Sequence, residues 1–151
     1  MLRNPSRVVI DVRAAFRTVT SRVFLFNRKN FIANDQPFFT PVLRPVPADR
    51  PAVGALDQLY AGPLNGQRAA GLRLLRSHST GFTGLSIRNR IARVRLLGQC
   101  SSDGSTVTVA GEIMPTLRAF PRVDWVKIYD PSGHTEHPRG QTDSIPACLE
   151  P

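Results

Sequence analysis

The sequence contains two cysteines, Cys100 and Cys148, whose side chains can form a covalent bond with each other. The pair can form one disulfide, which would imply an oxidising compartment, or it can remain as two free thiols. Two cysteines are too few for the disulfide framework of a small, loop-rich fold. Both stand in stretches typical of loops, and the residues alone leave the two alternatives open.

His134 and His137 stand in the stretch GHTEH, with two residues between them. Together with a cysteine such a pair could bind zinc, but this spacing is common and no Cys-x-x-Cys pattern accompanies it. We therefore interpret His134, His137 and the separate His78 as solvent-exposed loop residues. The sequence predicts no metal site.

Patterns typical of catalysis are missing from the sequence. It contains neither a G-x-S-x-G nucleophile elbow nor a glycine-rich phosphate loop of the Walker or Rossmann type. The 11 acidic residues are scattered over expected turns and helix faces, and no carboxylate pair stands out as acid and base. The sequence therefore predicts a protein that is not an enzyme, with no catalytic residue, no cofactor and no small-molecule substrate.

The chain has 20 Lys and Arg residues against 11 Asp and Glu residues, a formal net charge of +9. This charge favours anionic partners such as nucleic acid, acidic lipid head groups or wall polymers, although it can equally serve solubility alone. Basic residues gather around an expected β-hairpin: Arg73, Arg76, Arg88, Arg90, Arg93 and Arg95. Proteins that bind single strands interleave such charges with exposed aromatic rings, whereas Phe24, Phe26 and Phe38 stand in apolar runs typical of a core. A basic nucleic-acid-binding module, with weak and salt-sensitive binding, is our alternative hypothesis.

The centre of the expected fold is an apolar helix followed by a β-strand. Apolar residues recur at steps of three and four along one helix face: Val107, Ala110, Ile113, Met114, Leu117 and Phe120. A hydroxyl at Ser105 or Thr106 can cap the start, and Pro121 ends the helix. Pro115 lacks an N–H group and its ring presses on the carbonyl of Gly111, so we expect one kinked helix.

The strand is expected in the stretch VDWVKIYD, where Val123, Trp125, Lys127 and Tyr129 alternate with their neighbours. Both faces carry apolar groups, which favours a strand inside a sheet rather than at its edge. Trp125 and Tyr129 share one face, and with Lys127 and Arg122 they form a candidate interaction surface for weak self-association or hetero-association. The alternative is that the C-terminal tail folds back and covers this surface.

The remaining elements follow from apolar periodicity and from the positions of Pro and Gly. Strands are expected at residues 22–27, 38–46, 82–88 and 91–97, and helices at 47–62 and around 67–70. Pro41 and Pro45 confine the second strand to an edge, and residues 89–90 form the turn of a hairpin. Asp49 can cap the longer helix, and Gly62 ends it.

These elements follow one another in the order β-β-α-β-β-α-β, with a mixed sheet and two main helices. The sequence therefore predicts an α+β fold, a two-layer sandwich. We expect residues 1–21 to be a basic segment outside the core, 22–130 to be the domain, and 131–151 to be a Gly/Pro-rich tail. Asp11 and Arg13 interrupt the apolar run near the start, so a secretory signal peptide is not expected there.

In this order, several stretches resemble the GerMN domain, the sporulation and spore germination domain of bacterial envelope proteins. They are RVFLFN from Arg22, LRPVPADRPAVGALDQLYAGP from Leu43 to Pro63, the hairpin from Leu85 to Leu97, and TVAGEIMPTLRAFPRVDWVKIYDPSG from Thr108 to Gly133. The closing SIPACLEP is similar to the end of actinobacterial lipoproteins that carry this domain. The likeness covers residues 22–145 and rests on the ordered series of motifs.

The resemblance implies a non-enzymatic, extracytoplasmic module similar to the ring-building modules of secretion and sporulation assemblies. Its partners would be proteins of the cell envelope, other copies of the chain, or an anionic wall or lipid surface, with nucleic acid disfavoured. Export would place the chain in an oxidising compartment, so the resemblance favours a disulfide between Cys100 and Cys148 that ties the tail to the domain. Typical members carry a secretory or lipoprotein signal, which we do not expect in residues 1–21.

Overall fold

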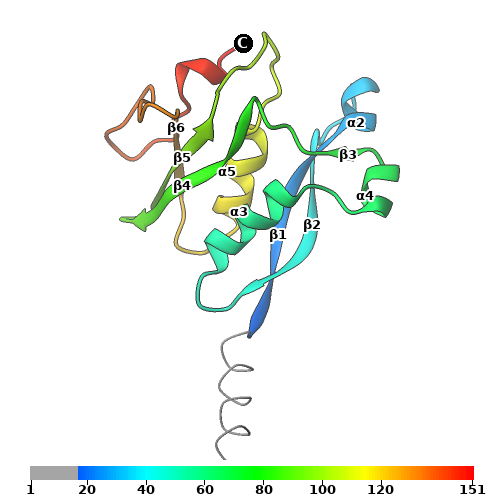
Figure 1. Cartoon of the computed structure of the whole chain (residues 1–151), viewed down its shortest axis with the longest axis horizontal. Helices are drawn as coiled ribbons and strands as arrows, with labels where there is room; N and C mark the ends of the chain where they lie inside the picture. Colours follow the sequence, from blue (N-terminus) through cyan, green and yellow to red (C-terminus); the bar gives the residue numbers. More distant parts are fainter. Residues whose placement is uncertain (1–16) are drawn as a thin grey trace, which may run out of the picture.

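The computed structural model describes residues 17–151, so only residues 17–21 of the expected N-terminal segment are described. Six strands, four α-helices and a short 3-10 helix follow one another (Figure 1): β1 (Thr18–Asn27), α2 (Arg28–Ile32), β2 (Phe39–Pro47), α3 (Pro51–Ala61), α4 (Asn65–Ala69), β3 (Leu72–Arg73), β4 (Ser79–Arg88), β5 (Ile91–Gly98), α5 (Ala110–Arg118), β6 (Trp125–Tyr129) and η1 (Ala147–Leu149). The α+β class is confirmed. The main elements keep the predicted order, and the short helix expected around residues 67–70 is α4. Only α2 and β3 were not predicted.

The strands form two three-stranded sheets, whereas the sequence predicted a single mixed sheet. The first sheet has the order β2-β1-β3 and is antiparallel. The second has the order β4-β5-β6, with β4 antiparallel and β6 parallel to β5. Helices α3 and α5 lie between the sheets (Figure 1), where α3 contacts β1, β2 and β4, and α5 contacts β1 and β6. One apolar core is therefore shared by both sheets and both helices.

Side chains of α5 explain why the two sheets do not join along β1. The Thr116 hydroxyl accepts the N–H of Phe24 at 2.9 Å, and a Glu112 carboxyl oxygen accepts the N–H of Phe26 at 3.1 Å. Since these backbone donors are already bonded, a further strand cannot use them to extend the sheet. β3 pairs with β1 only at Phe26 and Asn27, the last two residues of β1.

Helix α5 begins later than expected, at Ala110, because the preceding residues form a loop. Its N-cap is Val109, and no side chain caps it, so the predicted capping by Ser105 or Thr106 is wrong. The Thr108 hydroxyl instead accepts the N–H of Ala110 at 3.3 Å. The acceptor for this first N–H of the helix is therefore Thr108, one residue before the N-cap.

The buried face of α5 agrees with the prediction. Ile113 and Leu117 are both 0% exposed. The helix continues through Pro115 as one element, as expected. Gly111 lies so close to Phe39 that a Cβ there would be 2.2 Å from a ring carbon. Glycine at this position therefore allows α5 to approach β2.

Helix α3 is shorter at its start than predicted. It spans Pro51–Ala61, because Pro47 still belongs to β2. The N-cap is Arg50, without a side-chain hydrogen bond, so the predicted Asp49 cap is wrong. Gly62 ends the helix with a φ of 80°, as expected for a glycine in this position.

The hairpin of β4 and β5 turns at Asn89 and Arg90, as predicted, with φ angles of 52° and 65°. Positive φ at both central residues is typical of a type I′ turn, which matches the twist of the strands. Arginine is unusual at the second position. Here the Arg90 guanidinium donates to the Asp124 carboxylate at 3.0 Å and to the Pro121 carbonyl at 3.1 Å. The turn is thereby fixed to the segment that leads into β6.

The outer strands agree only in part with the sequence. β2 is the outer strand of the first sheet, as predicted from its prolines. β6 is the outermost strand of the second sheet, so its predicted place inside a sheet is wrong. The Ile128 N–H donates to the Ser144 carbonyl at 2.9 Å, and the Ser144 N–H donates to the Val126 carbonyl at 3.0 Å. The tail thus takes the place of a neighbouring strand along the outer edge of β6.

Candidate interaction surface

The outer face of the second sheet carries most of the side chains that the sequence proposed for interaction. Ala92, Val94, Val126 and Ile128 are buried in the core, so the side chains that alternate with them point to the opposite face. The strand register places these outer side chains in three rows: Arg88, Ile91 and Trp125; Ser86, Arg93 and Lys127; and Thr83, Arg95 and Tyr129. Three of the four proposed residues therefore belong to one face of β6.

Lys127 is not available on this face, because it is 0% exposed. Its Nζ donates to the carbonyl of His137 at 2.7 Å and to that of Arg139 at 3.4 Å. Burial lowers the pKa of the Lys127 amino group, and the positive charge of Arg93 lowers it further. Placing Lys127 on the rim of an open surface was wrong, because the tail folds over it.

Asp143 fixes this part of the tail against both β6 and α5. Its carboxylate accepts the N–H of Val126 at 2.9 Å and a guanidinium N–H of Arg118 at 2.6 Å. Together with the backbone bonds of Ser144, these contacts hold the tail along the outer edge of β6. Trp125 and Tyr129 remain half-buried beside it. The tail therefore covers part of the face, which is the alternative that the sequence left open.

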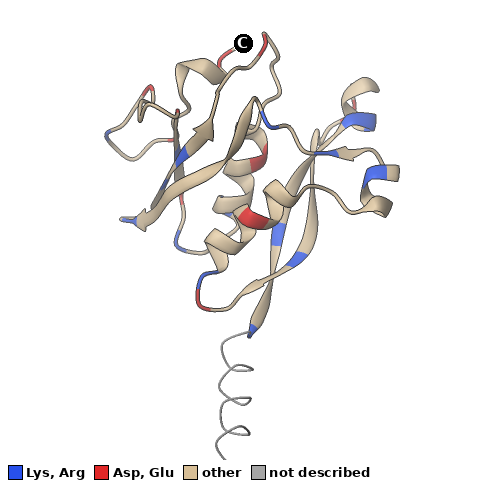
Figure 2. Ribbon diagram, in the orientation of Figure 1, with Lys and Arg blue, Asp and Glu red and all other residues tan. Residues whose placement is uncertain are grey.

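The uncovered part of the sheet face lies over β4 and β5 and is basic. Arg88 and Arg95 are exposed and Arg93 is half-buried; we call these three residues the arginine face. Within residues 17–151, none of the three forms an ion pair. Figure 2 shows that Lys and Arg positions occur on both sheets, while Asp and Glu positions are few. Unpaired positive charges beside two half-exposed aromatic rings suit a polyanion or an acidic protein surface.

Arg122, the fourth proposed residue, lies elsewhere. It is on the rim of an apolar groove of about 440 Å³, which we call the α3–β4 groove. The groove is lined by residues 50–53 at the start of α3, by Leu85 and Ile87 of β4, and by residues 120–122 after α5. The proposed surface is therefore divided between the outer sheet face, the space beneath the tail, and this groove.

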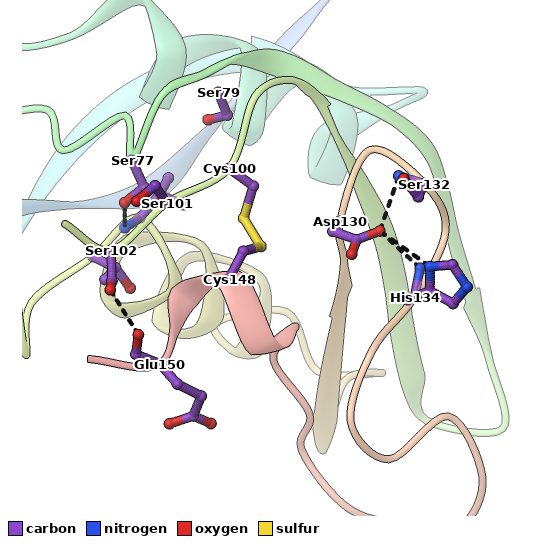
Figure 3. The surroundings of a disulfide bond; sticks show 12 residues. Ser77, Ser79, Cys100, Ser101, Ser102, Asp130, Ser132, His134, Cys148 and Glu150 are labelled. Atoms are coloured by element: carbon purple, nitrogen blue, oxygen red, sulfur yellow. Dashed lines mark hydrogen bonds and ion pairs between the residues drawn. A yellow bond between two sulfur atoms is a disulfide. The ribbon is translucent and has the colours of Figure 1, made fainter. Parts of the chain in front are cut away.

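The sulfur atoms of Cys100 and Cys148 lie 1.95 Å apart, at bonding distance, and their Cα atoms are 5.7 Å apart. Cys100 follows β5, and Cys148 lies in η1 (Figure 3). The Ser102 N–H donates to the Cys148 carbonyl at 2.8 Å, and the Ser102 hydroxyl donates to the Glu150 carbonyl at 2.6 Å. The sulfur pair and these two hydrogen bonds hold the end of the tail against the loop after β5.

The three histidines do not converge on one site. His78 Nε2 lies 2.6 Å from an Asp103 carboxylate oxygen, and this hydrogen bond lowers the pKa of the Asp103 carboxyl. The backbone N–H of His134, in the tail, donates to the carboxylate of Asp130, which directly follows β6 (Figure 3). In the part of the chain that the structure describes, no group of three or more His, Cys, Asp or Glu side chains could hold a metal ion.

Glu112 was not predicted from the sequence, although its carboxyl group lies in the core at 0% exposure. Its oxygens accept the N–H groups of Phe26 and Leu75 at distances of 3.0 to 3.1 Å. Burial raises the pKa of this carboxyl to about 9, against the opposing effect of the two N–H donors. The sequence feature that could have indicated this buried site is the polar pair of Glu112 and Thr116, which are four residues apart beside the apolar stripe of α5.

Replacing Lys127 with methionine should loosen the tail over β6. Methionine keeps an unbranched apolar stem but cannot donate to the carbonyls of His137 and Arg139, so we expect a loss of about 1–3 kcal/mol in the free energy of unfolding. Urea unfolding measures this loss, and proteinase K should cleave residues 131–145 faster. The control Arg139→Met alters an exposed side chain of the same tail and should change neither quantity. Equal cleavage of both variants would show that the ammonium group does not hold the tail.

Comparison of the chain with protein-family models, with curated proteins and with solved structures gave no match. The likeness to the GerMN domain therefore rests on the motifs quoted above. Across residues 17–151, no helix combines the length and the apolar character needed to cross a membrane.

Proposed function

We propose that this chain is a non-enzymatic, GerMN-like module of the cell envelope that acts by association with a protein or with an anionic wall polymer. The observation that supports this proposal is the arginine face, where Arg88, Arg93 and Arg95 stand without ion-pair partners on the uncovered part of a sheet. The resemblance to GerMN supplies the extracytoplasmic setting. The cysteine pair at bonding distance is compatible with that setting.

The spacing of the arginine face suits an extended anionic partner. Arg93 and Arg95 are two residues apart on β5, which separates their Cα atoms by about 6.6 Å along the strand. Arg88 belongs to the neighbouring strand, so the three charges form a patch rather than a line. Guanidinium groups bind phosphate or carboxylate with two parallel hydrogen bonds, and a partner of opposite charge relieves the repulsion between the three cations.

The full chain should co-sediment with insoluble wall material that carries phosphate polymers, and less of it should sediment as salt rises from about 0.05 M to about 0.5 M. The triple variant Arg88→Gln, Arg93→Gln, Arg95→Gln should bind at least about tenfold more weakly, because it loses the whole charged patch. A matched control removes three exposed charges from other surfaces: Arg22→Gln, Arg28→Gln and Arg68→Gln. Equal weakening in both variants would show that net charge alone, and not the arginine face, drives association.

Nucleic-acid binding is a second candidate, favoured by one observation. Trp125 and Tyr129 are half-buried on the same sheet face as the arginines, where the sequence had suggested that aromatic residues gather in the core. Fluorescence anisotropy with single-stranded DNA of mixed sequences separates the two functions. The envelope module predicts weak binding that does not depend on sequence and is lost with salt. Nanomolar, sequence-specific binding at physiological salt would favour the nucleic-acid function instead.

A further inference from the structure

We propose that the α3–β4 groove binds a short segment of a partner protein that has an apolar centre and acidic flanks. The inference rests on the proposed function, because it names a protein among the possible partners. It concerns a different surface, however, since the groove and the arginine face use none of the same residues.

The groove exists because α3 and β4 touch at one end and separate at the other. At the closed end, the Tyr60 hydroxyl lies 2.7 Å from the Ser79 hydroxyl, and the Tyr60 ring packs near Phe82 with centroids 6.1 Å apart. At the open end, the first turn of α3 faces Leu85 and Ile87 across the groove. Its volume of about 440 Å³ leaves room for a large apolar side chain and the backbone beside it.

The walls of the groove are apolar and only half-buried. Ala52, Val53, Leu85, Ile87 and Phe120 all keep part of their surface in contact with solvent there. Apolar surface that is concave and wet gains free energy when another apolar group displaces the water. The groove is therefore suited to an apolar side chain rather than to a polar loop.

The rim of the groove is positively charged. Arg50 and Arg122 are both exposed, form no ion pair within residues 17–151, and are the charged residues that line the groove. The first turn of α3 has no acidic residue and no side-chain cap, so its N-terminus adds positive potential. Carboxylates are the matching groups on the partner. A second copy of this chain, with its net charge of +9, would be repelled from the same rim.

The free edge of β4 favours an extended peptide over a lipid chain. β4 is the outer strand of its sheet. Arg88 and Ile91 flank a two-residue turn and so form a hydrogen-bonded pair, which directs the N–H and C=O of Ile87 away from β5. A peptide can add to this edge while its side chain enters the groove, whereas an acyl chain has no groups to bond there. The bulge between Thr83 and Ser86 confines such pairing to a short stretch.

The test uses three blocked pentapeptides, Glu-Leu-Phe-Leu-Glu, Lys-Leu-Phe-Leu-Lys and Glu-Ser-Gly-Ser-Glu, each titrated into the full chain and followed by amide NMR. The acidic apolar peptide should shift the amide signals of Ala52, Val53 and Ile87 with a dissociation constant of about 1 mM or tighter. The basic apolar and acidic polar peptides should bind at least about tenfold more weakly.

Charge reversal at the rim gives the sharpest outcome. The variant Arg50→Glu, Arg122→Glu should lose the acidic apolar peptide and gain the basic one, and it should sediment with wall material like the parent. The control Arg88→Glu, Arg95→Glu should bind the acidic apolar peptide as the parent chain does, but it should no longer sediment with wall material. Failure of the groove proposal can therefore be distinguished from failure of the proposed function. Four results would each overturn the inference. The three peptides could give equal shifts, or the shifts could be confined to the arginine face. The acidic apolar peptide could give no shifts at several-millimolar concentration, or the chain could bind laurate but no peptide.

Discussion

At about pH 5, where the stabilisation by its carboxyl group is largest, replacing Glu112 with alanine should lower the free energy of unfolding by about 3–5 kcal/mol. Its carboxyl group accepts the N–H of Phe26 in β1 and the N–H of Leu75 after β3, and alanine has no atom that can do so. Each buried N–H left without an acceptor costs about 1–3 kcal/mol, and the space left in the core adds to this. Urea unfolding followed by the fluorescence of Trp125, the single tryptophan, measures the loss. A loss below about 1 kcal/mol would show that the two N–H groups find other partners.

Glu112 should also make stability depend on pH. Its carboxyl has an ordinary pKa of 4.5 in the unfolded chain and a pKa of about 9 in the folded chain. Between these values the folded state holds a proton that the unfolded state has lost. The stabilisation is therefore complete below the unfolded pKa and is lost as the pH rises through the folded pKa. We expect the free energy of unfolding to fall from about pH 5 to about pH 9, by up to about 1.4 kcal/mol per pH unit.

Two variants isolate this effect. Glu112→Gln keeps a carbonyl oxygen as acceptor but does not titrate, so the slope between about pH 5 and about pH 9 should disappear. Asp57→Asn removes an exposed carboxylate from α3 and should leave the slope unchanged. Burial raises the pKa of the nearby Tyr60 hydroxyl above its ordinary value of 10, so Tyr60 does not contribute in this window. The same slope in Glu112→Gln as in the parent chain would assign the pH dependence to other groups.

Features that depend on a few neighbouring residues could be predicted from the sequence. Asn89 and Arg90 form the hairpin turn, because the two strands allow only a two-residue connection of positive φ. Gly62 ends α3, and Ile113 and Leu117 form the buried face of α5. In each case the backbone geometry or the helical period sets the outcome without reference to distant parts of the chain.

Features that depend on contacts between distant residues could not be predicted in this way. The division into two sheets follows from Thr116 and Glu112, which bond the backbone of β1 from positions 92 and 86 residues away. Lys127 was assigned to the correct strand face by alternation, but the sequence did not show that tail carbonyls would enclose its amino group. Arg122 was grouped with Trp125 because they are neighbours in sequence, whereas the chain turns between them and places Arg122 at the groove. The candidate site was therefore predicted in part and in the wrong grouping.

Removing the link between Cys100 and Cys148 should lower the free energy of unfolding by about 2–5 kcal/mol. The two cysteines are 48 residues apart, and closing a loop of this length restricts the unfolded chain by about 4 kcal/mol in the entropy model. The linked segment also places Leu149, which is 2% exposed, in the core. The double variant Cys100→Ser, Cys148→Ser should therefore unfold at lower urea concentration, and protease should reach residues 131–145 more readily.

Reduction separates the effect of the cross-link from that of the serine side chains. The parent chain treated with a phosphine reductant should match the double variant, and the double variant should not respond to the reductant. In native protein fractionated from its own cells, Cys100 and Cys148 should resist alkylation until they are reduced, because export would expose them to an oxidising compartment. Freely alkylated thiols in that protein would remove both the expected stabilisation and this support for an envelope location. The thiols could instead resist alkylation while reduction leaves the free energy of unfolding unchanged. This result would show that the bridge forms without supporting the tail.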